Sequence, residues 1–255
     1  MLSGAESEMT ATSVTLLRVA LFAYLAATLV YLAYITFARR RSVGIVAYTV
    51  LAAAFLVHTA FQVIRIIEYW AQHQAFILPA ASFIEAVSFC AWTVALVYLV
   101  GEWAIKTRLL GAAVCAVLTL LLGYAMLHGS SLAPRALMPA LKSPWLNIHV
   151  TTIMLSYAGL LLGSLVAVFY LLRLRGVRWV KNMFGNITLE DLDLLAYRFI
   201  VFAFPLLTLG IITGAIWADQ AWGRFWGWDP KETWSLITWL IWAGYLHTRL
   251  AFGWR

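Results

Sequence analysis

Long apolar runs alternate with short polar connections along almost the whole chain. A run of about 20 apolar residues is long enough to cross the hydrocarbon core of a bilayer as an α-helix. The pattern predicts seven such spans, so the expected fold is an all-α polytopic membrane protein. Their expected bounds are 14–38, 45–67, 80–104, 109–127, 147–172, 196–217 and 235–252.

The connections predict one membrane domain over residues 1–255, with no internal repeat. Residues 1–13 form a polar tail that lacks the basic start of a signal peptide. Residues 173–195 are basic and amphipathic, and Thr188 is expected to cap the helix that follows. Residues 218–234 carry an unusual density of tryptophan.

Composition agrees with a membrane protein, because 64% of the 255 residues are hydrophobic and only 11% are charged. Soluble domains are about half apolar and about a quarter charged. The net charge of +7 comes from short basic clusters between apolar runs, which is typical of topology signals and not of a nucleic-acid surface. Cys90 and Cys115 lie inside apolar runs and form no CxxC, so both are interpreted as buried small hydrophobes.

Basic residues gather on one side of the predicted spans, which sets an orientation. The positive-inside rule then places the N-terminus outside and the C-terminus in the cytoplasm, with 68–79, 128–146 and 218–234 as outer segments. The residues on the cytoplasmic side are Arg39, Arg40, Arg41, Lys106, Arg108, Arg173, Arg175, Arg178, Lys181, Arg198, Arg249 and Arg255.

Seven of the thirteen tryptophans lie between Trp217 and Trp242. An interfacial aromatic belt is the ordinary explanation for tryptophan in a membrane protein. A belt does not require glycines between the tryptophans, whereas glycine lets a backbone approach a flat ligand closely. Asp229, Pro230 and Glu232 form a helix-start signature after the tryptophans. The segment therefore predicts a rigid aromatic shelf for a large planar ligand, with Lys231 or Arg224 facing acidic groups on the ligand's edge.

Two histidines lie where they can ligate a haem iron. His149 is near the outer start of its helix, on the same side as the shelf. His247 follows Asp229 by 18 residues, which is about 27 Å of helix, so it is expected at a separate inner position. Intramembrane histidines also serve as hydrogen-bonded packing residues, and that alternative stays open for both.

Further polar residues lie within the second and third predicted spans. His58 is interpreted as part of a polar network, and Glu85 is expected to pair with Arg65 or to help bind a ligand. His73 and His128 lie in outer segments and carry no firm assignment.

Several stretches resemble the CcsA/ResC family of cytochrome c biogenesis proteins over residues 45–255. AWGRFWGWDPKETWSLITWL followed by YLHTR is similar to the WWD haem-handling motif of that family. WLNIHVTTIMLSYAGL is similar to the segment that carries its first external histidine ligand. FLVHTAFQVIRI and SFIEAVSFCAWTVALVYL resemble its second and third helices less closely.

The resemblance implies haem b as bound substrate, received at an inner site and then held at an outer site. The implied haem-binding residues are His149, His247, Trp222, Gly223, Trp226, Gly227, Trp228, Asp229, Pro230, Lys231, Glu232 and Trp234, with His58, Glu85 and Arg224 as possible additions. The family's further helix with a second external histidine has no counterpart after Phe252. Either the sequence is shortened, or the second outer ligand comes from His73, His128, a partner or the substrate's own histidine.

The resemblance also implies a function, an inner-membrane or thylakoid location, and an outward-facing active site. The expected role is the CcsA-like subunit of a System II cytochrome c synthase, a haem lyase. It would act with a CcsB/ResB-like subunit, apocytochrome c with its CxxCH motif, a thiol-disulfide reductant and membrane lipid. Two alternatives remain: a CcmC-type haem carrier without lyase activity, and a transporter or assembly factor with a tryptophan belt and no cofactor.

Overall fold

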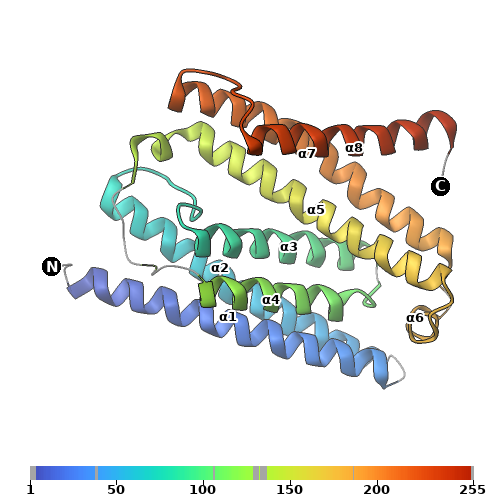
Figure 1. Cartoon of the computed structure of the whole chain (residues 1–255). Helices are drawn as coiled ribbons and strands as arrows, with labels where there is room; N and C mark the ends of the chain where they lie inside the picture. The colour runs from blue at the N-terminus through green and yellow to red at the C-terminus, as the bar shows by residue number, and fades with distance from the viewer. Residues whose placement is uncertain are drawn as a thin grey trace. The chain divides into compact units, whose positions relative to one another are not determined.

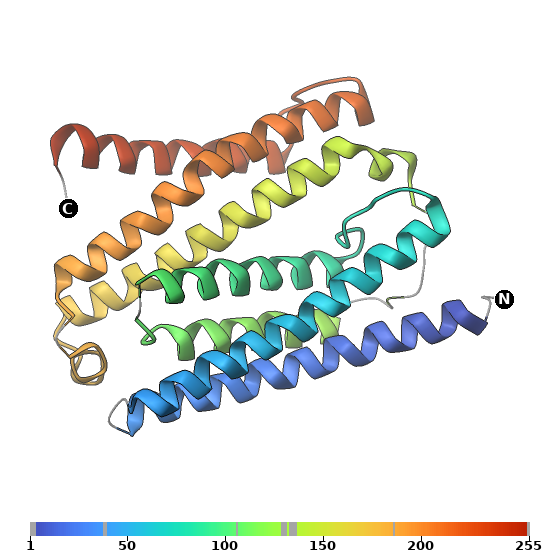
Figure 2. The same ribbon diagram turned by 180° about the vertical axis from the view of Figure 1, so that it is seen from behind.

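In the computed structural model, residues 4–37, 40–105, 107–128, 132, 137–185 and 187–253 are described, and all their regular structure is helical. This confirms the all-α prediction. Figures 1 and 2 show the helices from two sides. They are α1 (Gly4–Thr36), α2 (Arg41–His73), α3 (Phe83–Ile105), α4 (Gly111–His128), the short 3-10 helix η1 (Pro139–Lys142), α5 (Pro144–Leu174), α6 (Arg178–Phe184), α7 (Leu189–Trp222) and α8 (Pro230–Phe252).

Six helices in the described part of the chain are long and apolar enough to cross a membrane: α1, α2, α3, α4, α5 and α7. The chain is therefore an integral membrane protein. The seventh expected span, 235–252, is helical as part of α8 but is not among the six. Tryptophan, tyrosine, histidine and arginine make α8 less apolar than those six helices, and its crossing of the membrane stays a prediction. The orientation stays a prediction, and Arg39, Lys106, Arg135 and Arg255 lie outside the described residues.

The chain divides into two compact units, residues 1–142 and residues 143–255. Unit 1 is the bundle α1–α4. On α1, the buried positions Leu17, Ala20, Tyr24, Ala27 and Tyr31 recur at alternating spacings of three and four residues. That spacing places them on one stripe facing the bundle interior. The prediction of a single membrane domain over the whole chain stays a prediction.

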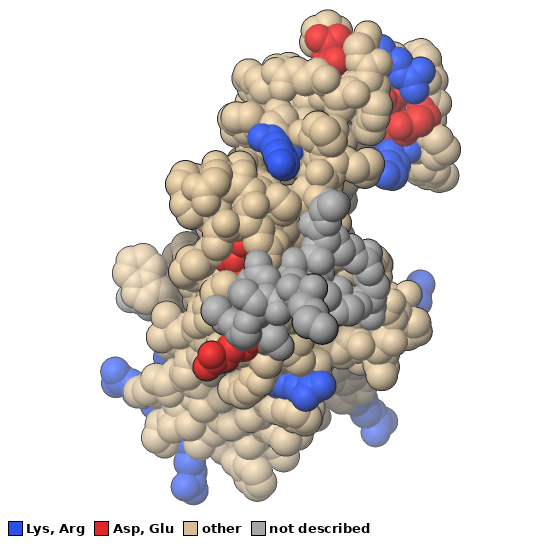
Figure 3. Space-filling model, turned by 90° about the vertical axis from the view of Figure 1, so that its left-hand side faces the viewer, with Lys and Arg blue, Asp and Glu red and all other residues tan. Residues whose placement is uncertain are grey.

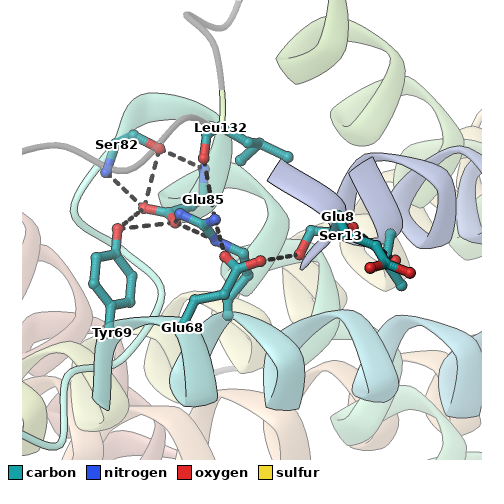
Figure 4. A network of polar contacts seen from close by, with 9 residues as sticks. Glu8, Ser13, Glu68, Tyr69, Ser82, Glu85 and Leu132 are labelled. Atoms are coloured by element: carbon teal, nitrogen blue, oxygen red, sulfur yellow. Dashed lines mark hydrogen bonds and ion pairs between the residues drawn. The ribbon is translucent and has the colours of Figure 1, made fainter. Parts of the chain in front are cut away.

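The predicted ion pair between Arg65 and Glu85 is confirmed in unit 1. Its guanidinium donates to Glu85 Oε1 from Nε at 2.8 Å and also contacts Glu68. Tyr69 donates to Glu85 as well, at 2.8 Å to Oε2. Figure 4 shows these side chains converging with Ser82 and the carbonyl of Leu132.

Unit 2 is built on the close packing of α5 against α7, which run side by side in both views (Figures 1 and 2). Each helix carries two glycines four residues apart, Gly159 and Gly163 on α5 and Gly210 and Gly214 on α7. A Cβ at Gly159 would lie 2.8 Å from the Cβ of Ala203. Small residues at this spacing allow membrane helices to approach closely, where van der Waals packing replaces the hydrophobic effect.

Helix α8 rests on α7 through two polar contacts. Trp239 donates from Nε1 to Thr208 at 2.9 Å. Further along, the Arg249 guanidinium donates to both oxygens of Asp193, at 2.7 and 2.5 Å, and lies over the ring of Tyr197. These contacts fix which face of α8 points toward α7.

The 173–195 segment contains α6 and the start of α7. Thr188 caps α7 as predicted, because its hydroxyl accepts from the backbone N–H of Asp191 at 3.1 Å. The Asp191 carboxylate accepts in return from the backbone N–H of Thr188, which completes a capping box. The cytoplasmic position of this segment stays a prediction.

Candidate functional site

The connection between α7 and α8, residues 223–229, is tied at both ends by its own sequence. Gly223 ends α7 in the left-handed region, with φ of 71°, and donates to the carbonyl of Asp219 at 2.7 Å. Asp229 starts α8 by accepting from the backbone N–H of Glu232 at 2.9 Å, and Pro230 occupies the first helical turn. The predicted helix-start signature is confirmed.

Glu232 holds the turn from inside. One oxygen of its carboxylate accepts from the backbone N–H of Gly227 at 2.6 Å and from that of Asp229 at 3.3 Å. Hydrogen bonds to an ionised acceptor are about twice as strong as neutral ones. The charge of Glu232 therefore fixes the path of the chain on both sides of Trp228.

Trp228 lies in the left-handed region with φ of 57°. That conformation is costly for a bulky residue, by about 1–3 kcal/mol, and persists only where the surroundings enforce it. Such strain is concentrated at ligand sites and clamps. It turns the indole outward, so that 70% of Trp228 is exposed.

Tryptophans in the connection and on the adjoining ends of α7 and α8 pack edge to face or are exposed. Trp226 and Trp228 meet edge to face at 5.8 Å, and Trp217 and Trp222 do so at 4.8 Å. Trp222 and Trp234 are mostly exposed. The buried indole N–H of Trp226 has no hydrogen-bond partner among the described residues. A buried donor without an acceptor is unfavourable, and an acceptor group on a ligand would satisfy it.

Arg224 lies against the backbone of Gly227. A Cβ at Gly227 would be 2.5 Å from the guanidinium carbon, so a larger residue there would move the exposed Arg224 side chain aside. Figure 3 shows acidic and basic side chains close together at the top of the view, with further charged side chains scattered below. Figure 1 places the α7–α8 connection at that end. In the sequence, the tryptophans lie among charges of both signs, namely Arg224, Asp229, Lys231 and Glu232.

His149 is oriented by α7. Its Nδ1 lies 2.7 Å from the carbonyl oxygen of Gly210. A carbonyl oxygen only accepts, so Nδ1 carries the hydrogen and Nε2 of the neutral ring keeps its lone pair. This is the arrangement that orients histidine ligands in metal sites. The ring lies parallel to Trp217, with centroids 6.4 Å apart.

Gly214 is required by the same histidine. A Cβ there would lie 2.7 Å from both Cε1 and Nδ1 of the His149 ring. The glycine pair of α7 therefore has two roles: Gly210 supplies the carbonyl, and Gly214 leaves space for the imidazole. Sequence reasoning missed this, although the four-residue glycine spacing on both helices was visible.

His247 lies on the exposed face of α8, and its ring meets Phe252 edge to face at 5.9 Å. It is two residues from Arg249, which binds Asp193 at the start of α7. Asp193 and Gly210 are 17 positions apart on α7, about 25 Å of helix. The two histidines are thus at separate levels of unit 2, as the spacing predicts.

His58 and Glu85 lie in unit 1, each within a buried polar network. His58 has protein partners at both ring nitrogens, Tyr24 at Nδ1 and Ser88 at Nε2. Its interpretation as a polar-network residue agrees with this arrangement. Glu85 is engaged by Arg65, Tyr69 and Ser82.

Comparison with known proteins identifies the family. The model of the family described as "Cytochrome C assembly protein" matches residues 80–255, which covers α3 through α8. This chain belongs to that family. The match includes the α7–α8 connection and both histidines of unit 2, whereas α1 and α2 lie outside it.

Curated relatives within this family carry the name "Cytochrome c biogenesis protein CcsA". The protein of Pyropia yezoensis is 40% identical over 217 residues, covering 69% of this chain and 68% of its own. That of Microcystis aeruginosa is 36% identical over 226 residues, covering 69% of each. That of Prochlorococcus marinus is 39% identical over 220 residues, covering 75% of this chain and 69% of its own. No solved structure gives a significant match.

The family and its relatives establish the broad role. The chain is an integral membrane protein of cytochrome c biogenesis, as the resemblance implies, and this process involves haem.

Proposed function

We propose that this chain holds haem b at the α7–α8 connection and presents it for attachment to apocytochrome c. The role is that of the CcsA-like subunit of a System II synthase. The observation that carries the proposal is the hydrogen bond from His149 to Gly210, which leaves Nε2 as the ligating nitrogen. Haem is a planar molecule whose iron binds histidine and whose macrocycle can pack against exposed tryptophan faces.

The other residues of the site have distinct tasks in this proposal. Trp222, Trp228 and Trp234 offer apolar faces to the macrocycle. The propionates face Arg224, Lys231 and the unpaired indole N–H of Trp226. Gly223, Gly227, Asp229, Pro230 and Glu232 set the path of the connection.

The chemistry would belong to haem and its protein substrate. Each thioether bond forms when the S–H of a substrate cysteine adds across a haem vinyl group, so no atom is lost. The chain would contribute orientation and a dry, ligated environment. A CcsB/ResB-like subunit, a thiol-disulfide reductant and the apocytochrome are the proposed partners. His247 is the proposed ligand at a second, inner haem position, which the partner subunit completes.

The first test is the reduced-minus-oxidised visible spectrum of the purified chain, alone and with a CcsB-like partner. Wild type, His149→Ala and His247→Ala are compared. A b-type spectrum that weakens in either variant supports two sites, and one that appears only with the partner indicates a shared inner site. A colourless protein under both conditions would contradict the proposal.

The reaction product distinguishes a synthase subunit from the alternative, a haem carrier. In cells that lack their own synthase, coexpression with the partner and an apocytochrome yields covalent haem if the chain is a synthase subunit. A carrier of the CcmC type gives bound haem on the membrane protein but no covalent haem on the cytochrome. Haem-stained denaturing gels distinguish the two results.

A further inference from the structure

The interior of unit 1 contains a column of polar side chains. Helices α1–α4 are each apolar enough to cross a membrane, yet their inner faces carry buried charges and hydroxyls. Ionisable groups inside a membrane are costly and mark ion or proton pathways. The groups involved are Ser13, Tyr24, Tyr31, His58, Gln62, Arg65, Glu68, Tyr69, Glu85, Ser88, Tyr98, Glu102 and Cys115, with Arg108 at one end.

One end of the column surrounds Glu102. Tyr31 donates to its Oε2 at 2.6 Å, and Arg108, whose side chain is 29% exposed, donates to its Oε1 at 3.3 Å. Arg108 belongs to the connection predicted to face the cytoplasm. This carboxylate is therefore buried but touches a group that reaches the surface.

The middle of the column is centred on His58, which is fully buried. Its Nδ1 lies 3.1 Å from the hydroxyl of Tyr24, and its Nε2 lies 2.8 Å from the hydroxyl of Ser88. Gln62 donates to the same Ser88 hydroxyl at 3.3 Å. A neutral imidazole between two hydroxyls can accept a proton at one nitrogen and release one from the other.

The other end of the column is the network of Figure 4. Arg65 lies between the carboxylates of Glu68 and Glu85, and Ser13 of α1 donates to Glu68 at 2.9 Å. Two carboxylates share one guanidinium, so the group carries one excess negative charge when both are ionised. That excess charge makes it a proton acceptor.

Short steps connect the middle group to the Arg65 network. Gln62 and Arg65 are one helical turn apart on α2, as are Glu85 and Ser88 on α3. The buried side-chain amide oxygen of Gln62, Oε1, accepts no hydrogen bond from the residues described. An acceptor in this position is suited to a water molecule that bridges the middle group to the Arg65 network.

The longest step lies between Tyr24 and Tyr31, two turns apart on α1, or about 10 Å. The thiol of Cys115 on α4 is fully buried, and α4 packs along α1, the helix that carries both tyrosines. This step is the largest gap in the column and would limit proton transfer along it.

Packing does not explain such a column. Buried ion pairs are often no more stabilising than well-packed apolar residues of the same volume. The column also extends beyond the matched family region, which begins at residue 80. Helix α1 supplies Tyr24 and Tyr31, and α2 supplies His58 and Arg65.

We propose that the α1–α4 bundle relays protons along this column between its Glu102 end and its Glu85 end. A proton passes from Tyr24 to Nδ1 of His58 while Nε2 releases one to Ser88, so the ring ends neutral in its other tautomer. Each hydroxyl gives one proton to the next group and takes one proton from the preceding group. No oxidant or reductant is consumed. This activity is independent of the proposed haem site in unit 2.

The test reconstitutes the full chain in vesicles that contain a pH-sensitive dye, with a potassium gradient and valinomycin to drive proton entry. Wild type is compared with His58→Asn, with the nearly isosteric Glu102→Gln, and with protein-free vesicles. Glu190→Gln is the matched control, because Glu190 is an exposed acid in the first turn of α7. Size-exclusion profiles and thermal unfolding establish that each variant is folded, and haem content is measured on the same samples.

We expect wild type and Glu190→Gln to admit protons faster than protein-free vesicles. His58→Asn and Glu102→Gln are expected to lose that protein-dependent entry while keeping their haem. Glu102→Gln alone suffices if His58→Asn fails to fold. Wild-type entry no faster than the lipid background, or unchanged entry in folded variants, would overturn the relay and leave the haem proposal untouched.

Discussion

At the scale of single residues, the candidate site depends on hydrogen bonds that set orientation. Glu232 determines the path of the backbone around Trp228, and the Gly210 carbonyl determines which nitrogen of His149 is free. Neither residue contributes by being exposed to solvent. Each holds a neighbouring group in a position that the sequence pattern alone does not specify.

Replacing Glu232 with alanine should loosen the α7–α8 connection. The backbone N–H groups of Gly227 and Asp229 lose a charged acceptor, and we expect about 1–3 kcal/mol less stability, with weaker haem binding. Thermal unfolding in detergent and haem titration measure the two effects. Glu190→Ala, an exposed acid in the first turn of α7, should change neither property. Equal effects of the two substitutions would exclude a specific role for Glu232.

Gly214→Ala should displace the His149 imidazole, because the new Cβ would lie 2.7 Å from the ring. We expect most of the haem bound through His149 to be lost, as measured by the visible spectrum. Gly244→Ala is the control, since no atom lies within 4 Å of its Cβ position. There alanine should keep haem binding and add about 0.5–1 kcal/mol of helix stability. Normal haem content in Gly214→Ala would show that His149 does not ligate iron.

At the scale of helices, α5 and α7 form the rigid part of unit 2, and α8 is attached to it by fewer contacts. The glycine pairs bring α5 and α7 together, so His149 on one helix reaches Gly210 and Gly214 on the other. Helix α8 is held near its far end by Arg249 and Asp193. The level of His247 relative to α7 therefore depends on this ion pair.

A double-mutant cycle on Arg249→Ala and Asp193→Ala should reveal coupling between α7 and α8. The pair is bidentate and mostly buried, so we expect a coupling free energy of about 1–2 kcal/mol in thermal unfolding. The double variant should also lower haem retention at the His247 position. Additive single effects would show that the pair does not hold α8.

At the scale of the whole molecule, six apolar helices place the chain in a membrane, and basic connections predict its orientation. A cysteine introduced as Arg224→Cys should react with a membrane-impermeant thiol reagent in intact cells. Arg175→Cys should react only after the cells are opened. The reverse pattern of labelling would invert the predicted orientation and place the aromatic shelf in the cytoplasm.

Local signals in the sequence determined much of what the structure contains. Apolar periodicity located the spanning helices, and the capping residues Thr188 and Asp229 located two helix starts, because these features depend on nearest neighbours along the chain. Intramembrane charge alone indicated that Arg65 and Glu85 would pair. Residue types and spacing likewise pointed to His149, His247 and the tryptophans.

Only the tertiary structure decided how these parts meet. The free nitrogen of His149 depends on a carbonyl 61 positions away on α7, and the partners of His58 come from α1 and α3. The strained backbone of Trp228 and the unpaired N–H of Trp226 follow from the folded connection as a whole. Hydrogen-bond partners across helices are set by rotation and packing, and a linear pattern of polar and apolar residues does not encode them individually.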